Sequence, residues 1–280
     1  YTATRSITPR KYWNPNYYGT GLLMGRVEEK VVLITGAASG LGFADAHRLA
    51  EEGAKLVLTD INRNDGEALA SELGEAALFI EQDVSEEQSW DLVIDQTLKR
   101  FGRLDALVNN AGIAPISDIE KTTTQEWRRV MGVHVDATFF GCRSAIPIMT
   151  KSGGGSIINM SSIAALVGLS SYLSYSSAKG AIRSMTKSIA MHCIESRNNI
   201  RCNSIHPGSI STPMVHQALE SLAGFKLMEQ EDPEATRKKM RIGEPLDIAN
   251  MVLFLVSDES KHLNGAELVI DQGAVLGTPS

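Results

Sequence analysis

Strand and helix signals alternate along this sequence from residue 30 almost to its end. Short runs rich in apolar residues predict strands at 31–34, 55–60, 77–80, 105–108, 156–159, 200–205 and 268–270. Between them lie helical patterns at 41–52, 65–73, 124–149, 172–195 and 245–256, and one further helix that Ser85 is expected to cap. Strands that are joined through helices pair in parallel. The alternation therefore predicts an α/β, Rossmann-type, doubly wound parallel sheet with helices on both faces.

Composition limits the classes of partner. The 280 residues carry 27 basic and 33 acidic side chains, and this net charge of −6 argues against a nucleic-acid surface. No charged residue occurs between Lys151 and Lys179, but glycines and serines interrupt this stretch, which predicts a pocket wall rather than a membrane span. Three cysteines without a CxxC pair fit a cytoplasmic protein, and the histidine spacing predicts no metal site.

The first 24 residues differ from the rest. Residues 1–24 contain several aromatic residues, prolines and glycines and show neither a strand nor a helix period. We interpret them as an irregular arm, either a disordered tail or a segment that packs on a neighbouring subunit. Residues 25–280 are expected to form a single dinucleotide-binding and catalytic domain.

A glycine-rich loop follows the first predicted strand. The sequence Thr35-Gly-Ala-Ala-Ser-Gly-Leu-Gly42 connects that strand to the next helix. Gly36 permits a sharp turn, Gly40 lets the backbone approach a pyrophosphate, and Gly42 lets helix and strand pack closely. Because the free N–H groups at a helix start attract phosphate, we expect a dinucleotide to bind here.

Acidic residues at the ends of the next two strands predict the adenosine end of this site. A carboxylate at Asp60 would accept hydrogen bonds from the ribose of NAD and repel the 2′-phosphate of NADP. NAD is therefore the expected cofactor, although Arg63 lies close by and could instead approach a phosphate. Asp83 and Val84 follow the third strand and are expected to meet the adenine edge.

Five short motifs occur in order along the chain. They are the glycine loop, Asn109-Asn110-Ala111-Gly112, Ser162, Tyr175-x-x-x-Lys179 and Pro207-Gly208. In this order and spacing they resemble the short-chain dehydrogenase/reductase family over about residues 25–280. Within that family, blocks 155–160, 203–207 and 252–260 are most similar to bacterial hydroxysteroid and cyclic-alcohol dehydrogenases.

Tyr175 and Lys179 form the predicted catalytic pair. They lie one helical turn apart and so share a face of the predicted helix. A free tyrosine is a poor base at neutral pH, and a neighbouring ammonium group is expected to lower the pKa of the phenol. The resemblance implies that Tyr175 removes the alcohol proton while hydride leaves to the nicotinamide, and that Lys179 also holds the nicotinamide ribose. It also implies that Ser162 hydrogen-bonds the substrate oxygen.

The motifs and the resemblance together give the expected cofactor contacts and the assembly. Residues expected to contact NAD are Gly36, Ser39, Gly40, Leu41, Gly42, Asp60, Ile61, Asp83, Val84, Asn110, Ala111, Gly112, Tyr175, Lys179, Pro207, Gly208, Ile210 and Thr212. The resemblance further implies a homotetramer, in which the helices at 124–149 and 172–195 pair across one interface.

One position departs from the family pattern. The family has an asparagine in the long helix, which kinks the helix and holds a water molecule in a proton relay to the lysine. Here the matching segment is Val133-His134-Val135, so His134 is a fourth catalytic candidate. A histidine could also hold the water and, with an ordinary pKa of about 6.5, make the relay sensitive to pH. The alternative is a tolerated structural histidine.

The expected substrate side is apolar. Predicted pocket residues are Ile163, Ala164, Leu169, Tyr172 and Met214. Few charged residues face this region, which favours a neutral, largely apolar alcohol or ketone over a phosphorylated or carboxylated substrate. The irregular segment 214–241 is expected to form a lid over it.

The sequence thus predicts an NAD-dependent oxidoreductase that interconverts a secondary alcohol and a ketone. The expected substrate is a small apolar cyclic molecule, such as a hydroxysteroid, a cyclic alcohol or a dihydrodiol. Two alternatives remain open. One is an isomerase or dehydratase that uses bound NAD transiently, and the other is a dinucleotide-binding sensor without turnover, which His134 makes conceivable.

Overall fold

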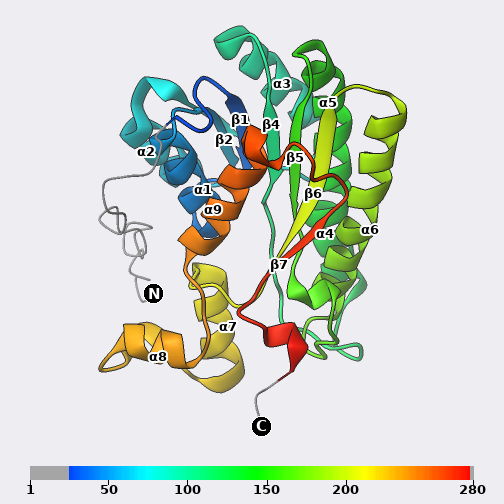
Figure 1. Ribbon diagram of the computed structural model, residues 1–280. Coiled ribbons are helices and arrows are strands. Elements are labelled where there is room, and N and C mark those ends of the chain that lie inside the picture. Colours follow the sequence, from blue (N-terminus) through cyan, green and yellow to red (C-terminus); the bar gives the residue numbers. More distant parts are fainter. Residues whose placement is uncertain (1–24, 278–280) are drawn as a thin grey trace.

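The computed structural model describes residues 25–277, and the strands in this range form one sheet (Figure 1). The predicted arm at 1–24 lies outside the described residues. The strands are β1 (Val31–Thr35), β2 (Lys55–Asp60), β3 (Ala77–Glu81), β4 (Ala106–Asn109), β5 (Gly155–Met160), β6 (Ile200–Pro207) and β7 (Glu267–Ile270). All neighbours pair in parallel, in the order β3-β2-β1-β4-β5-β6-β7. The predicted parallel α/β fold is confirmed.

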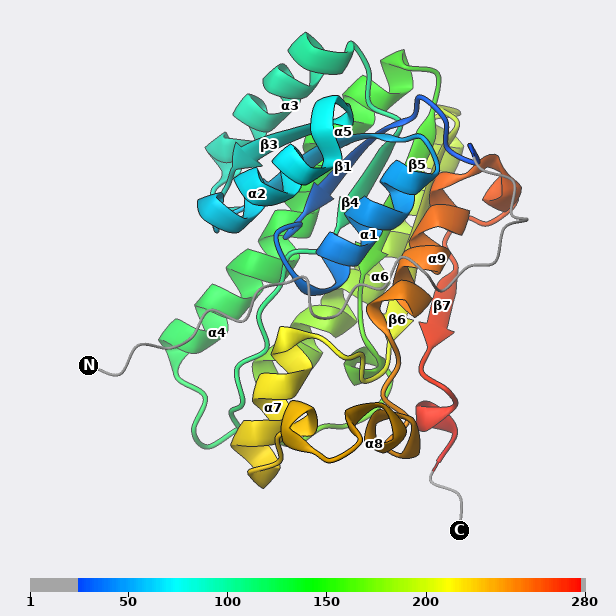
Figure 2. The ribbon, with the colours of Figure 1, turned by 90° about the vertical axis from the view of Figure 1, so that its left-hand side faces the viewer.

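Helices cover both faces of this sheet (Figures 1 and 2). They are α1 (Gly40–Glu51), α2 (Arg63–Leu73), α3 (Glu87–Phe101), α4 (Thr124–Met131), α5 (Ala137–Lys151), α6 (Leu173–Glu195), α7 (Pro213–Ala223), α8 (Pro233–Lys239) and α9 (Pro245–Val256). Helices α1, α2 and α9 lie on one face, and α3, α5 and α6 lie on the other. None of the helices within residues 25–277 has both the length and the apolarity needed to cross a membrane.

The sheet is buried between two hydrophobic clusters because side chains alternate along each strand. In β1, Val32 and Ile34 join the cluster beneath α1 and α9, whereas Val31 and Leu33 join the cluster beneath α3 and α5. Every residue of β1 is buried, as its continuous apolar run predicts. The sheet therefore holds its strand ends in fixed positions, which is what a site built at those ends requires.

Strand order reverses between β1 and β4. From β1 the chain moves outward to β2 and β3, and then returns to β4 on the other side of β1 before continuing to β7. In sheets of this type, the loops that follow the strands diverge at the reversal and leave a crevice for a ligand. Helices α7 and α8 lie beyond this end of the sheet (Figure 2).

The structure differs from the sequence prediction at two helix starts. Helix α3 begins at Glu87 without a side-chain cap, and Ser85 instead donates its hydroxyl to Asp83 at 2.6 Å. The carboxylate two residues earlier competes successfully for the hydroxyl, so the predicted Ser85 cap is wrong. Helix α6 begins at Leu173, with Tyr172 at the N-cap position.

The predicted long helix at 124–149 is divided into three segments. Helices α4 and α5 are joined by a π-helical turn, Gly132–Asp136, which contains His134. A π-turn accommodates one extra residue per turn and often marks a functional site. The segment 214–241 is also more regular than expected, because it contains α7 and α8.

The carboxyl group of Asp45 is buried inside α1. Its side chain is fully buried, and no described residue hydrogen-bonds to either carboxyl oxygen. Burial raises the pKa of Asp45 well above its ordinary value. A carboxyl whose pKa is higher in the folded than in the unfolded state favours folding at low pH. This contribution is fully present below the unfolded pKa and is lost as the pH rises through the folded pKa.

Asp45→Asn is therefore expected to stabilise the protein more at pH 8 than at pH 5, by about 1–3 kcal/mol at the higher pH. The amide keeps the shape of the carboxyl group but carries no charge. Urea unfolding of both proteins at the two pH values measures the difference. Asp91→Asn, on the exposed side of α3, makes the same charge change as a control. A gain that is equal at both pH values would contradict the explanation.

Candidate active site

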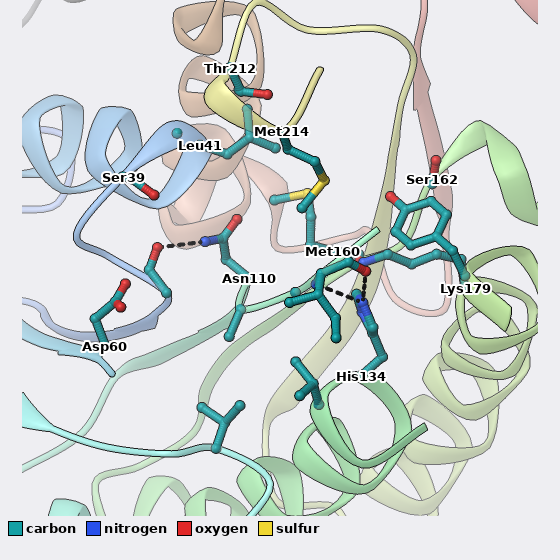
Figure 3. A pocket seen from close by; sticks show the side chains of 18 of the residues that line it. Ser39, Leu41, Asp60, Asn110, His134, Met160, Ser162, Lys179, Thr212 and Met214 are labelled. Carbon is teal, nitrogen blue, oxygen red and sulfur yellow. Dashed lines mark hydrogen bonds between the residues drawn. The ribbon is translucent and has the colours of Figure 1, made fainter. Parts of the chain in front are cut away.

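A cavity of about 480 Å³ lies where the strands end (Figure 3). The loops after β1, β2, β3, β4, β5 and β6 all contribute to its wall, together with α4, α6 and α7. Figure 3 shows Ser39 and Asp60 at one end of the cavity and Ser162, Lys179 and His134 at the other. The reversal of strand order thus brings together residues that are far apart in the sequence.

Nearly all residues predicted for catalysis or cofactor contact line this cavity. They are Gly36, Ser39, Gly40, Leu41, Asp60, Ile61, Asp83, Val84, Asn110, Ala111, Gly112, His134, Ser162, Tyr175, Lys179, Pro207, Gly208, Ile210 and Thr212. The exception is Gly42, which lies behind the wall. A Cβ atom there would come within 2.4 Å of the Gly36 carbonyl oxygen and 2.6 Å of Asn110 Nδ2.

The glycine loop is tied to the end of β4 by a small hydrogen-bond network. Asn110 Nδ2 donates to the carbonyl oxygens of Thr35 (2.9 Å) and Gly36 (3.1 Å). In return, Thr35 Oγ1 accepts from the backbone N–H groups of Asn110 (3.0 Å) and Ala111 (3.1 Å). Gly36 has a φ of 65°, which a side chain would strain, and a Cβ there would lie 2.8 Å from Ala111 Cα. The two loops therefore hold each other in place.

The carboxylate of Asp60 is fixed at the edge of the loop. Its Oδ2 accepts from the Ala38 N–H at 3.0 Å, and its Oδ1 accepts from the Asn62 N–H at 2.9 Å. The neighbouring Arg63 is exposed and donates to Glu67 at 2.7 Å. A negative charge is therefore held beside the cavity, while the guanidinium that could approach a phosphate pairs with a carboxylate along α2.

Tyr175 and Ser162 meet at the other end of the cavity. Burial raises the pKa of Tyr175, whereas a hydrogen bond with the Ser162 side chain lowers it. Ser162 caps a short 3₁₀ turn, Ile163–Ala165, and its Oγ accepts from the Ala164 N–H at 3.1 Å. The hydroxyls of Ser162 and Tyr175 therefore converge at the cavity wall, from the end of β5 and the start of α6.

Lys179 is buried one turn further along α6. Its Nζ donates to the Met160 carbonyl oxygen at 2.6 Å and lies 5.4 Å from the centre of the Tyr175 ring. Burial lowers the pKa of Lys179 to about 7. The expected lowering of the Tyr175 pKa by this ammonium is not what the structure shows, because burial dominates and raises the pKa of the phenol.

His134 is a neutral, buried histidine rather than a group that titrates near pH 6.5. Burial most of all, together with the charge of Lys179, lowers its pKa to about 3, against a backbone hydrogen bond with Ile113 that raises it. Its Nε2 lies 3.0 Å from the Ile113 nitrogen and 2.8 Å from the Ile113 oxygen, and its ring meets Tyr175 edge-on at 5.6 Å. The lowered pKa argues against a relay that His134 makes sensitive to pH near 6.5, and the part of His134 in the reaction stays a prediction.

The predicted substrate residues are less well placed. Met214 lines the cavity, whereas Ile163, Ala164, Leu169 and Tyr172 do not. Ala164 is buried beneath the turn that follows β5, and the Tyr172 ring packs against Tyr175 with 6.2 Å between ring centres. The burial of Ala164 depends on the turn after β5, a local conformation that an apolar pattern does not reveal.

Sequence reasoning also missed part of the wall. The further lining residues are Gln82, Ser85, Ile113, Arg128, Arg129, Gly132, Val133, Met160, Ser161, Pro213 and Val215. Position directly after a strand could have identified Gln82 and Ser161. No sequence pattern identifies Arg128 and Arg129 as lining residues, because they reach the cavity wall only through the way α4 packs against the loops.

The residues present fit a dinucleotide. Three features lie along one side of the cavity. They are the point at Gly36 where two loops approach closely, the backbone N–H groups at the start of α1, and the fixed carboxylate of Asp60. These are the elements that hold a pyrophosphate and a ribose. Among residues 25–277, no group of three or more histidine, cysteine or acidic side chains is arranged to hold a metal ion.

Comparisons with known proteins agree with this arrangement. The model of a family described as Enoyl-(Acyl carrier protein) reductase matches residues 36–275. An NADP-dependent (R)-specific alcohol dehydrogenase from Lentilactobacillus kefiri is 42% identical over 252 residues, covering 89% of this chain and 97% of that protein. A 3-beta-hydroxysteroid dehydrogenase from Comamonas testosteroni is 40% identical over 255 residues, covering 91% and 99%. The crystal structure of a levodione reductase matches with a TM-score of 0.80 at 33% identity, covering 90% and 99%.

Proposed function

The chain belongs to the short-chain dehydrogenase/reductase family, and on that premise we propose that it is an NAD-dependent dehydrogenase of apolar cyclic secondary alcohols. The observation that carries the proposal is the convergence of Ser162, Tyr175 and Lys179 at one end of a cavity whose other end suits a dinucleotide. The relatives support the general activity of an alcohol dehydrogenase, because the Lentilactobacillus protein is an alcohol dehydrogenase and the Comamonas protein is a hydroxysteroid dehydrogenase.

Each of the three residues has a distinct role in the proposed reaction. Ser162 donates a hydrogen bond to the substrate oxygen and so sets its position beside the phenol. Tyr175 takes the proton of the alcohol in oxidation and returns it to the ketone oxygen in reduction. Lys179, when charged, stabilises the phenolate that forms in the oxidising direction. Bound NAD supplies the hydride acceptor.

His134 and the cavity wall support this chemistry without exchanging protons. The ring of His134 packs on Tyr175, and it contacts the backbone of Ile113 beside Gly112. We propose that His134 fixes the position of the Tyr175 phenol relative to the loop after β4. Met160, Ile210 and Met214 add apolar surface near the reacting end, which suits a substrate with few polar groups.

NAD is proposed as the preferred cofactor, in contrast to the NADP named for the Lentilactobacillus relative. Asp60→Asn removes the charge that repels a 2′-phosphate while keeping the size of the side chain. We expect this variant to raise kcat/KM for NADP relative to NAD by about 10- to 100-fold, which corresponds to about 1–3 kcal/mol. Steady-state kinetics with both cofactors measures the ratio.

The control for this prediction is Asp91→Asn, which makes the same charge change on the exposed surface of α3. It should leave the ratio of the two cofactors unchanged. A wild-type protein that already uses NADP more efficiently than NAD would overturn the cofactor assignment.

The substrate class is tested by a screen for NADH formation. Hydroxysteroids, monocyclic alcohols and dihydrodiols are each supplied with NAD, and absorbance of NADH and formation of the ketone are followed together. Equal amounts of NADH and ketone support the proposal. A rearranged or dehydrated product without net NADH would instead show an isomerase or dehydratase, and absence of any turnover with NAD bound would contradict an enzymatic role.

The resemblance to the family also supports a proposal about assembly. We propose a homotetramer with α5 and α6 at one interface, where Phe139, Met191 and Ile194 are about half exposed in the single chain. Three buried, free cysteines are consistent with the proposed cytoplasmic location.

A further inference from the structure

A buried histidine outside the cavity wall contacts the backbone of Ser162. His206, on β6, has no exposed surface. Its Nδ1 lies 3.1 Å from the Ser162 carbonyl oxygen, and its Nε2 lies 2.9 Å from Ser204 Oγ. Parallel pairing places Ile205 beside Met160, so His206 lies next to the turn by which the chain leaves β5. A side chain of β6 is thereby connected to a residue at the end of β5.

The hydrogen-bond partners determine which nitrogen of His206 carries the proton. The Ser162 carbonyl can only accept, so Nδ1 must be the donor. In a neutral ring Nε2 is then a bare acceptor, which the Ser204 hydroxyl satisfies. The opposite tautomer would place two lone pairs against each other at 3.1 Å. The contacts therefore select the Nδ1–H tautomer of His206.

The surroundings of His206 keep its ring neutral. Burial lowers the pKa of His206 most, and the positive charges of Arg183 and Lys179 lower it further, whereas the Ser162 carbonyl and Glu267 raise it. Arg183 itself pairs with Glu267 at 2.8 Å. A neutral ring adds no second positive charge beside Lys179.

The contact with His206 bears directly on the orientation of Ser162. The residue is fully extended, with φ −170° and ψ 161°, and its carbonyl oxygen also accepts from the Ala165 N–H at 3.0 Å. Because the peptide that carries this carbonyl is planar, its rotation would move the 3₁₀ turn and with it the Ala164 N–H from which Ser162 Oγ accepts.

We propose that His206 is a positioning residue for the reaction. Its Nδ1–H holds the Ser162 peptide so that the hydroxyl of Ser162 stays directed at the phenol of Tyr175. This inference rests on the proposed function, in which Ser162 binds the substrate oxygen. His206 itself does not line the cavity, and it acts only through Ser162 and its turn.

The first test reads the tautomer and requires no substrate. Nitrogen-15 NMR of the histidine rings distinguishes Nδ1–H from Nε2–H, and the signal of His206 is assigned by its loss in His206→Asn. The expected result is the Nδ1–H form at neutral pH. An Nε2–H form, or a fully protonated ring, would overturn the proposal. If the wild-type protein turns over no alcohol, the proposed function fails while this measurement still decides the geometry around Ser162.

The second test compares two replacements of His206. His206→Leu removes the donor, whereas the amide nitrogen of His206→Asn lies near the position of Nδ1 and can still donate to Ser162. We expect the leucine variant to lower kcat by about 10- to 100-fold at an unchanged dissociation constant for NADH, and the asparagine variant to recover most of this loss. Equal losses in both variants, or a parallel loss of NADH binding, would indicate a structural role only and contradict the proposal.

Ser204→Ala keeps the proposal testable if the leucine variant does not fold. Without the Ser204 hydroxyl, Nε2 loses its donor, but the Ser162 carbonyl still requires Nδ1 to carry the proton. The variant is expected to keep the Nδ1–H tautomer by NMR and to lower kcat less than His206→Leu does. An unchanged tautomer together with a full fall in kcat would contradict the proposed connection.

Discussion

Tyr175→Phe is expected to lower kcat for alcohol oxidation by about 100- to 10,000-fold, the range typical for loss of a general acid–base group. The variant keeps the ring that packs on His134 at 5.6 Å and lies 5.4 Å from Lys179 Nζ, and it loses only the hydroxyl. Binding of the dinucleotide should therefore persist. Steady-state kinetics gives kcat, and a fluorescence titration with NADH gives the dissociation constant.

Tyr172→Phe is the matched control. Tyr172 also loses a phenolic hydroxyl in this variant, and its ring lies only 6.2 Å from that of Tyr175, but it does not line the cavity. Its kcat should stay within a few-fold of the wild type. If Tyr175→Phe retained more than about a tenth of the wild-type kcat, less than 1.4 kcal/mol of the barrier would depend on the hydroxyl. The proposed proton transfer would then be wrong.

The pKa values of Tyr175 and Lys179 refine how these two residues work together. Burial raises the pKa of Tyr175 and lowers that of Lys179 to about 7, so both groups are shifted toward their neutral forms. A neutral phenol is a ready proton donor to a ketone, whereas oxidation needs the phenolate and gains from the lysine charge. The sequence predicted the helical spacing of the two residues but not their burial, and burial decides both pKa values.

The sequence predicted correctly that residues at strand ends line the cavity. Gly36 directly follows one buried strand and Asp60 ends the next, and strand ends converge in a parallel sheet whatever the details of packing. The orientation of His134 could not be predicted in this way, since it depends on a π-turn within what the pattern shows as one helix. The turn after β5 likewise directs Ala164 into the core rather than into the cavity.

Gly42→Ala is expected to weaken NADH binding by about 10- to 100-fold and to destabilise the fold by about 1–3 kcal/mol. Gly42 lies in α1 outside the cavity, yet the added methyl group would sit 2.4 Å from the Gly36 carbonyl oxygen and 3.0 Å from Ala37 Cα. These are backbone atoms that cannot rotate away. The start of α1 must therefore move off the loop, which misplaces the N–H groups proposed to hold the pyrophosphate.

The same substitution in a helix without such contacts separates packing from helix propensity. Gly180 lies in α6, and a Cβ there would meet no atom within 4 Å. Gly180→Ala is expected to stabilise the protein by about 0.5–1 kcal/mol, because alanine loses less conformational entropy than glycine in a helix. Urea unfolding and NADH titration of both variants make the comparison. If Gly42→Ala also gained stability and kept its affinity for NADH, the close approach at Gly36 would not be what shapes the dinucleotide site.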